Sequence, residues 1–443
     1  MNGKHSQSSC PDPANESIRE QELGRLPPRA WLIVALLWVV ACLNYLDRVM
    51  IVTMRTSLKE AIAMTDAQFG LLTTAFLLVY GLLSPFAGFL ADRFSRSRVI
   101  IGSLFAWSFI TWLTAHAKTY EQLLATRFLM GISEACFIPA ALALVSDYHQ
   151  GPTRSKATGL VLGGVFVGSG MGGLGGWLAE RHGWGYAFNF FGLIGIFYCV
   201  IIAALLRDPP PTPRKSQSAN NPLQNVRLKE ALASLFRNGT FILLLIYWGL
   251  LGLAGWMVVG WMPTYFQEHF HMRQGAAGLT ATVYLYSACM VGLVIGGTLA
   301  DRWSLKNRAA CVQVSIIGLC LAAPSILLVA TAGVLPLAIV GLIAYGLTRS
   351  FADTEMMPIL CLTADPRYRA TGFGVLNLFS CLVGGATIYL GGVLRDSHVN
   401  VNKLFQFGAF GILVCAAVLW WVKIRTLQVP SSSNPDSSHE SRR

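Results

Sequence analysis

Four ionisable residues interrupt two apolar stretches of this sequence and could together do chemistry. Asp47 and Arg48 are adjacent in the first apolar stretch, and Arg127 and Glu134 are seven residues apart in the fourth. Because seven residues make nearly two helical turns, Arg127 and Glu134 share one helix face. A charge at the centre of a bilayer costs about 2.5 to 3.5 kcal/mol even on lenient scales, so each residue needs a partner or a use.

The residue types indicate anion binding coupled to proton transfer. An arginine offers a planar fork that suits a carboxylate, phosphate or sulfate, so Arg48 and Arg127 are candidate substrate-binding residues, with Tyr45 beside them. A carboxylate in a dry environment is suited to carrying protons, which makes Asp47 and Glu134 candidate proton carriers. The alternative is an interhelical staple in which the four charges neutralise one another. Buried ion pairs stabilise proteins less than apolar packing does, which favours the functional interpretation.

Three further charges and one amide lie in later apolar stretches. Arg349 and Asp353 are spaced i, i+4, so they are either a self-neutralising pair on one helix or part of a site. Glu355 lacks such a partner and is the stronger candidate for proton coupling. Asn377 is a polar residue in an apolar run, where it would contact a substrate hydroxyl or form an interhelical hydrogen bond.

The elements that position these residues are membrane-spanning helices. Only 13% of the 443 residues are charged, 54% are hydrophobic, and the mean hydropathy is +0.52. A soluble chain has about a quarter charged residues. Twelve apolar runs are long enough to cross about 30 Å of hydrocarbon, which predicts an all-α membrane protein. They lie at 31–54, 71–91, 99–117, 120–145, 157–179, 184–206, 240–266, 276–300, 309–331, 335–361, 370–393 and 404–422.

One long polar interruption divides the chain into two six-helix halves. The predicted segments are an N-terminal tail 1–29, a bundle 30–206, a central loop 207–238, a second bundle 239–424 and a C-terminal tail 425–443. Most of the 34 Lys and Arg residues lie in the tails, the central loop and the other loops of that side, which predicts that both termini are cytoplasmic. Because these residues are spread over loops, the net charge of +12 does not indicate a nucleic-acid partner.

The same loop pattern occurs in both halves. The sequence GFLADR, which contains Asp92 and Arg93, recurs as GTLADR, which contains Asp301 and Arg302. Such a recurrence indicates an internal duplication. The pattern Gly-x-x-x-Asp-Arg resembles the conserved loop of the major facilitator superfamily, and the resemblance covers nearly the whole chain. It implies two pseudo-symmetric six-helix bundles and implies that these four residues gate the protein by latching the halves.

The charged segments carry a narrower resemblance. The residues around Arg48 and around Glu134 look like those of the anion:cation symporter branch, which includes bacterial sugar-acid transporters. That resemblance implies that Arg48 and Arg127 hold the substrate carboxylate, and that Asp47 and Glu134 carry protons. The same Asp-Arg and Gly-x-x-Glu-Ala pairs also occur in Spinster-like transporters, which are associated with lysolipid and sphingolipid export.

The sequence thus predicts a secondary active transporter in the plasma membrane, the inner membrane of a bacterium. The leading hypothesis is proton-coupled symport of a small organic anion, such as a sugar acid, by alternating access. The alternative is a Spinster-like or multidrug-type proton antiporter exporting an amphipathic substrate, which a wide, lipid-open, aromatic cavity would favour. We expect neither an enzymatic nucleophile nor a cofactor or metal site. We also expect the protein to be a monomer and its C-terminal half mainly to shape the cavity.

Overall fold

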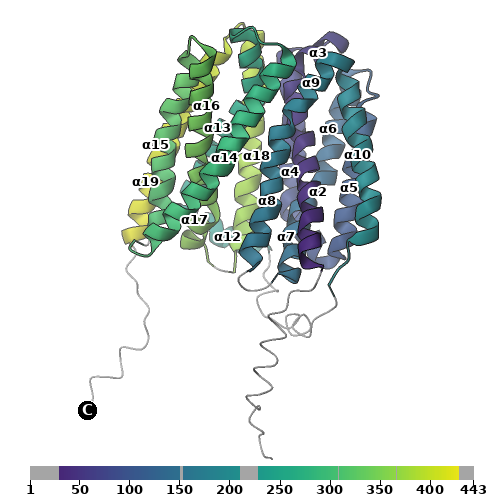
Figure 1. Ribbon diagram of the computed structural model, residues 1–443. Coiled ribbons are helices and arrows are strands. Elements are labelled where there is room, and N and C mark those ends of the chain that lie inside the picture. Colours follow the sequence, from purple (N-terminus) through teal and green to yellow (C-terminus); the bar gives the residue numbers. More distant parts are fainter. Residues whose placement is uncertain (1–28, 150–152, 210–227, 308, 366, 429–443) are drawn as a thin grey trace, which may run out of the picture.

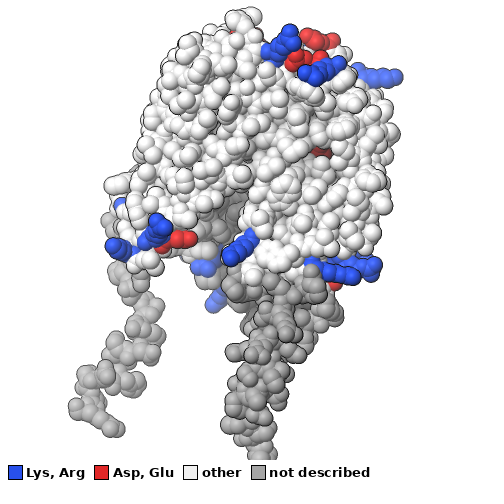
Figure 2. Space-filling model, in the orientation of Figure 1, with Lys and Arg blue, Asp and Glu red and all other residues white. Residues whose placement is uncertain are grey.

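The computed structural model describes residues 29–149, 153–209, 228–307, 309–365 and 367–428, and within these ranges the secondary structure is helical, without strands. Twelve helices or broken helices are long and apolar enough to span a membrane. The predicted all-α fold with twelve spanning helices is therefore confirmed. The described charged side chains gather mainly at the two ends of the molecule, with a largely uncharged band between them (Figure 2).

The N-terminal half contains six spans, of which the fourth and the fifth are each built from two helices. A short helix, α3 (Arg55–Ala61), follows the first span. The spans are α2 (Ala30–Thr53), α4 (Asp66–Arg93), α5 (Arg96–Thr114), α6 with α7 (Tyr120–Glu134 and Phe137–Tyr148), α8 with α9 (Thr153–Met171 and Gly173–His182) and α10 (Trp184–Leu205).

The C-terminal half repeats this plan, preceded by a short helix, α12 (Leu228–Arg237). Its fourth span is again broken. The spans are α13 (Gly239–His269), α14 (Gln274–Ser304), α15 (Ala310–Thr331), α16 with α17 (Leu335–Thr354 and Met356–Thr363), α18 (Arg369–Asp396) and α19 (Val401–Gln428).

Prolines account for the two breaks in the fourth spans. Pro139 and Pro358 each lie at the third position of the second helix, and a proline there cannot donate the backbone hydrogen bond that would continue the preceding helix. Glu134 is the last residue of α6, and Glu355 lies between α16 and α17. Both breaks therefore place a carboxylate where helical geometry is interrupted.

The two halves stand side by side, and their largest contacts are between two pairs of spans (Figure 1). α4 packs against α18, and α14 packs against α8 and α9. We call the end of the molecule with α3 the α3 end and the opposite end, with α12 and α17, the α12 end. The surface is hollowed between the halves toward the α12 end (Figure 2).

Glycines allow α8 to pack unusually close to α2. A Cβ added at Gly168 would lie 2.1 Å from the carbonyl oxygen of Cys42, and one added at Gly164 would lie 2.5 Å from that of Trp38. Real side chains do not approach a backbone so closely, so these positions require glycine. The short distance packs the helix that carries Arg48 directly against α8, and both helices line the cavity described below.

We expect Gly168→Ala to destabilise the protein by up to about 3 kcal/mol, because α8 and α2 must move apart to admit the methyl group. The measurement is the apparent Tm and the monodisperse fraction of the purified protein in detergent. Gly163→Ala is the matched control, since its nearest heavy atom would lie 4.0 Å away. Equal losses in the two variants would contradict the role of this contact.

Candidate functional site

A cavity of about 300 Å³ lies between the two halves and is lined by residues from both. The N-terminal half contributes α2 and α8, and the C-terminal half contributes α13, α14, α16, α17 and α18. Of the residues that the structure describes, three charged ones face the cavity, namely Arg48, Arg349 and Asp353. Its aromatic lining consists of Tyr45, Phe166, Trp256, Tyr286 and Tyr345.

Arg48 is held in the cavity wall by a buried carboxylate. Its Nε lies 2.6 Å from Oε2 of Glu134, and the two side chains are 3% and 0% exposed. The guanidinium carbon lies 4.5 Å from the centre of the Tyr45 ring and 4.2 Å from that of Tyr80, both at cation–π distance. Among the residues that the structure describes, none is a hydrogen-bond partner of the buried Nη2 of Arg48. The site therefore holds an arginine of fixed position whose hydrogen-bonding capacity is not fully used.

Asp47 and Arg127 lie behind this pair, inside the N-terminal bundle. Asp47 accepts a hydrogen bond of 3.0 Å from the hydroxyl of Thr111. Arg127 is 1% exposed, stacks over the ring of Phe188 at 5.4 Å and interacts electrostatically with Asp47 and Glu134. Its Nε and Nη2 have no hydrogen-bond partner among the described residues. The structure thus gathers the four predicted charges, but Arg127 does not line the cavity in this conformation.

The C-terminal half contributes a second arginine and carboxylate to the same cavity. Nη1 of Arg349 lies 2.8 Å from Oδ2 of Asp353, and the side chains are 18% and 25% exposed. The i, i+4 spacing placed both residues on one helix face, but the sequence did not show that this face turns toward the cavity. The charged lining therefore comes from both halves, and not from the N-terminal half alone.

Glu355 and Asn377 are not among the residues that line this cavity. Glu355 is 4% exposed and interacts electrostatically with Asp301 of α14. Asn377 donates a hydrogen bond of 3.1 Å from Nδ2 to the hydroxyl of Ser84, which joins α18 to α4. Of the two interpretations of Asn377, the structure shows the interhelical hydrogen bond.

The residues of the repeated loops lie at the α12 end. Arg93 ends α4 and is exposed, and Asp301 and Arg302 are exposed in the last turns of α14. The side chain of Asp92 lies outside the described part of the chain.

An ionic cluster that the sequence did not predict joins the halves at the α3 end. Asp66 of α4 accepts hydrogen bonds from Arg55 at 2.6 Å, from Lys59 at 2.6 Å and from Arg395 at 3.1 Å. Glu268 of α13 accepts from Arg55 at 3.2 Å and from Arg395 at 2.6 Å. Arg395 and Glu268 belong to the C-terminal half and the other three to the N-terminal half. The cluster therefore ties the two bundles together.

Further polar contacts close the same end. The carboxylate of Asp396 accepts from the backbone N–H groups of Asp66 and Ala67 at 2.8 and 2.9 Å, so a residue of the C-terminal half caps the first turn of α4. Glu180 accepts from the backbone N–H of Gly275 at 2.6 Å. Polar contacts thus join the halves at the α3 end, while the surface is hollowed at the α12 end.

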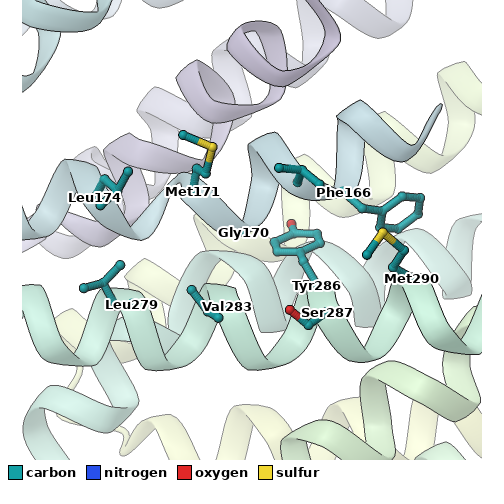
Figure 3. Close-up of a pocket in the computed structure, with 10 residues that line it drawn as sticks. Phe166, Gly170, Met171, Leu174, Leu279, Val283, Tyr286, Ser287 and Met290 are labelled. Atoms are coloured by element: carbon teal, nitrogen blue, oxygen red, sulfur yellow. The ribbon is translucent and has the colours of Figure 1, made fainter. Parts of the chain in front are cut away.

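An apolar groove of about 270 Å³ lies between α8, α9 and α14 (Figure 3). Val283 is 43% exposed and Met171 is 39% exposed, so the groove faces the outside of the bundle. Phe166 and Tyr286 line both this groove and the central cavity. In Figure 3 the ring of Tyr286 points from α14 toward Gly170 of α8. The two rings form the boundary between an outward-facing apolar surface and the charged cavity.

Comparison with known proteins agrees with this architecture. The chain is 24% identical over 419 residues to protein spinster homolog 1 of Xenopus laevis, covering 88% of this chain and 78% of that one. It is 25% identical over 397 residues to a gallate transporter of Pseudomonas putida, covering 82% and 86%. A crystal structure of a bacterial homolog of the human lysosomal transporter Spinster, inward-facing and unoccupied, superposes with a TM-score of 0.71 at 21% identity and covers 90% of this chain and 96% of that one.

The family assignment rests on most of the chain. Residues 37–388 match the Major Facilitator Superfamily, a segment that contains both repeated loops and all the charged residues of the cavity. The similar solved structure shares the overall fold of this chain. The protein is therefore an integral membrane transporter that belongs to the major facilitator superfamily.

Proposed function

We propose that this transporter moves a small organic anion across the membrane in symport with protons. The observation that carries the proposal is Arg48, a cavity-lining arginine held at 2.6 Å by the fully buried Glu134. A guanidinium in this position can bind a substrate carboxylate, and Tyr45 can contact the body of the substrate. The similarity to a gallate transporter supports an organic acid as substrate.

The buried pair also supports proton coupling. Glu134 and an incoming carboxylate compete for the same guanidinium, and two anions beside one cation are unfavourable in a buried site. Protonation of Glu134 removes its charge and leaves the donors of Arg48 to the substrate. Asp47, which like Glu134 interacts electrostatically with Arg127, is the second proton carrier of this arrangement. Binding of the anion is therefore linked to protonation of Glu134.

The gates of the proposed cycle lie at opposite ends. The ionic cluster around Asp66 closes the α3 end in this structure. We propose that Asp92, Arg93, Asp301 and Arg302 hold the α12 end closed in the other state, and that Glu355, beside Asp301, couples a proton to that closure. With both termini cytoplasmic in a bacterial inner membrane, the structure is inward-facing.

Uptake into proteoliposomes tests the coupling. We expect the wild type to accumulate gallate or a sugar acid only when a proton gradient is directed inward. Glu134→Gln should lose the response to the gradient but retain exchange of labelled for unlabelled substrate, because a permanently neutral residue 134 still permits anion binding. Uptake by the wild type that is indifferent to the gradient would rule out symport.

A second candidate function is export of an amphipathic anion in exchange for protons. The groove between α8 and α14 favours it, because an apolar chain lying there would place its anionic group near the central cavity across Phe166 and Tyr286. The similarity to Spinster proteins is consistent with this alternative.

Filling the groove distinguishes the two candidates. Val283→Trp adds an indole to the groove wall, distant from Arg48, and we expect at least about tenfold slower transport of a lysophospholipid if the groove holds an acyl chain. Transport of gallate should fall by less than about twofold. Val340→Trp, at an exposed position on α16 outside the groove, is the matched control. Unchanged lysophospholipid transport in Val283→Trp would exclude the groove as a chain site.

A further inference from the structure

We propose that Arg349 is a second anion-binding residue and that the preferred substrate carries two anionic groups, one for each half of the protein. The inference rests on the proposed function, because it assumes that an organic anion binds Arg48. The central cavity contains one arginine on α2 and another on α16, and each is held by one carboxylate. A substrate with a single acidic group can replace only one of these carboxylates.

The guanidinium of Arg349 is incompletely satisfied. Within the described part of the chain, Nη1 is paired with Asp353 at 2.8 Å, Nη2 makes a long hydrogen bond of 3.4 Å to the carbonyl oxygen of Leu251, and Nε has no partner. Buried donors normally find an acceptor, and leaving one unmade costs about 1–3 kcal/mol. The fork of Arg349 therefore has capacity for a second acceptor that enters from the cavity.

The surrounding backbone makes room for this fork. A Cβ added at Gly255 of α13 would lie 2.6 Å from Nη2 and 3.1 Å from Cζ of Arg349. The guanidinium thus occupies a space that exists because residue 255 has no side chain. The ion pair with Asp353 orients the fork, and the missing side chain at position 255 leaves room for it there.

Among the described neighbours of Arg349, Asp353 is the one acidic residue paired with its guanidinium. Tyr345 lies on the same helix, and Tyr286 and Cys289 face the arginine from α14; all three line the cavity. An anion can therefore bind the guanidinium of Arg349 by displacing the carboxylate of Asp353, or after Asp353 is protonated.

The charges of the two pairs explain why two anionic groups would fit. Arg48 with Glu134, and Arg349 with Asp353, are each neutral as they stand. Two acidic groups of one substrate, with two protons taken up by the carboxylates, leave the cavity neutral again. Because the arginines belong to different halves, a dianion bridges the halves, whereas a monoanion does not. A cavity of about 300 Å³ suits a small ligand of this kind.

Calorimetric binding to the purified full-length protein tests the inference with matched probes. These are terephthalate and its monomethyl ester, and adipate and its monomethyl ester. We expect each dianion to bind the wild type at least about tenfold more tightly than its ester, a difference of about 1.4 kcal/mol. Arg349→Gln should weaken dianion binding at least about tenfold and ester binding less than about threefold. Arg48→Gln should weaken both probes.

Two further variants keep the result interpretable. Gly255→Ala displaces the fork without removing its charge, so it should reduce the preference for dianions in the same way, even if Arg349→Gln does not fold. Arg181→Gln, an exposed arginine stacked on Trp177 outside the cavity, should leave both affinities within about twofold.

The outcomes separate this inference from the proposed function. If the esters bind the wild type as tightly as the dianions, or if Arg349→Gln and Gly255→Ala leave the preference unchanged, the inference is wrong while anion binding at Arg48 stands. If neither dianion nor ester binds, and gallate and sugar acids are not taken up into proteoliposomes, the proposed function itself fails.

Discussion

Replacing Arg48 with leucine should reduce transport at least about a hundredfold and lower the free energy of unfolding by about 3–5 kcal/mol. The substitution removes the arginine that faces the cavity and leaves the carboxylate of Glu134 buried without the guanidinium that lies 2.6 Å from it. Transport is measured as initial uptake into proteoliposomes, and stability as unfolding in mixed micelles. The loss of transport and the loss of stability have one physical cause, the removal of the arginine from a buried ion pair.

A double variant separates the two effects. Arg48→Leu with Glu134→Leu removes both charges, so stability should return to within about 1 kcal/mol of the wild type, because replacing a buried ion pair by apolar residues is often neutral. Transport should remain absent, since nothing is left to bind the anion or carry the proton. Recovery of transport in the double variant would show that the pair is a structural staple.

Asp66→Asn should shift the protein toward the state that is open at the α3 end by at least about tenfold. Asp66 is the acceptor for Arg55, Lys59 and Arg395, and hydrogen bonds to charged partners contribute about 1.5–3 kcal/mol each. Without the carboxylate, the three cations remain close together and repel one another more strongly. Glu268, whose side chain is 43% exposed, is then the acceptor left to the two arginines. The gap between the halves should then open at this end.

Disulfide crosslinking measures this shift. The hydroxyl of Thr56 and the side-chain oxygen of Gln267 lie 3.0 Å apart across the halves, so a Thr56→Cys, Gln267→Cys pair should crosslink readily in the otherwise unchanged protein. Cleavage at a protease site introduced between the halves shows whether they remain joined. Asp66→Asn should slow crosslinking at least about tenfold.

Glu268→Gln is the control: its carboxylate is 43% exposed, so its loss should have a smaller effect. Unchanged crosslinking in Asp66→Asn would mean that the cluster does not hold the gate closed.

The sequence predicted the fold because its strongest signals are local. An apolar run of about 20 residues and a repeated loop can each be recognised without knowing what they contact. The cost of burying a charge also showed that Asp47, Arg48, Arg127 and Glu134 had to face the interior. The structure brings these four together around the contact of Arg48 with Glu134.

The sequence around a charged residue does not show whether its side chain faces the interior of its own bundle or the cavity between the two bundles. Arg127 faces the middle of its own bundle, whereas Arg349, which the i, i+4 spacing alone would allow to pair harmlessly with Asp353, faces the cavity between the bundles. Both positions are equally sheltered from lipid, so hydropathy and the cost of charge burial cannot distinguish them. The rotation of each helix within its bundle decides the matter.

Twelve spans, two related halves and a set of charges that must avoid lipid follow from local patterns in the sequence. The meeting of Arg48 and Arg349 in one cavity, and the contact of Asp66 with Arg395, 329 positions away, become visible in the folded protein alone. Hydrophobic spans and helix periodicity are encoded in consecutive residues. Ion pairs across two bundles depend on how twelve helices pack, and no short segment of the chain specifies that packing.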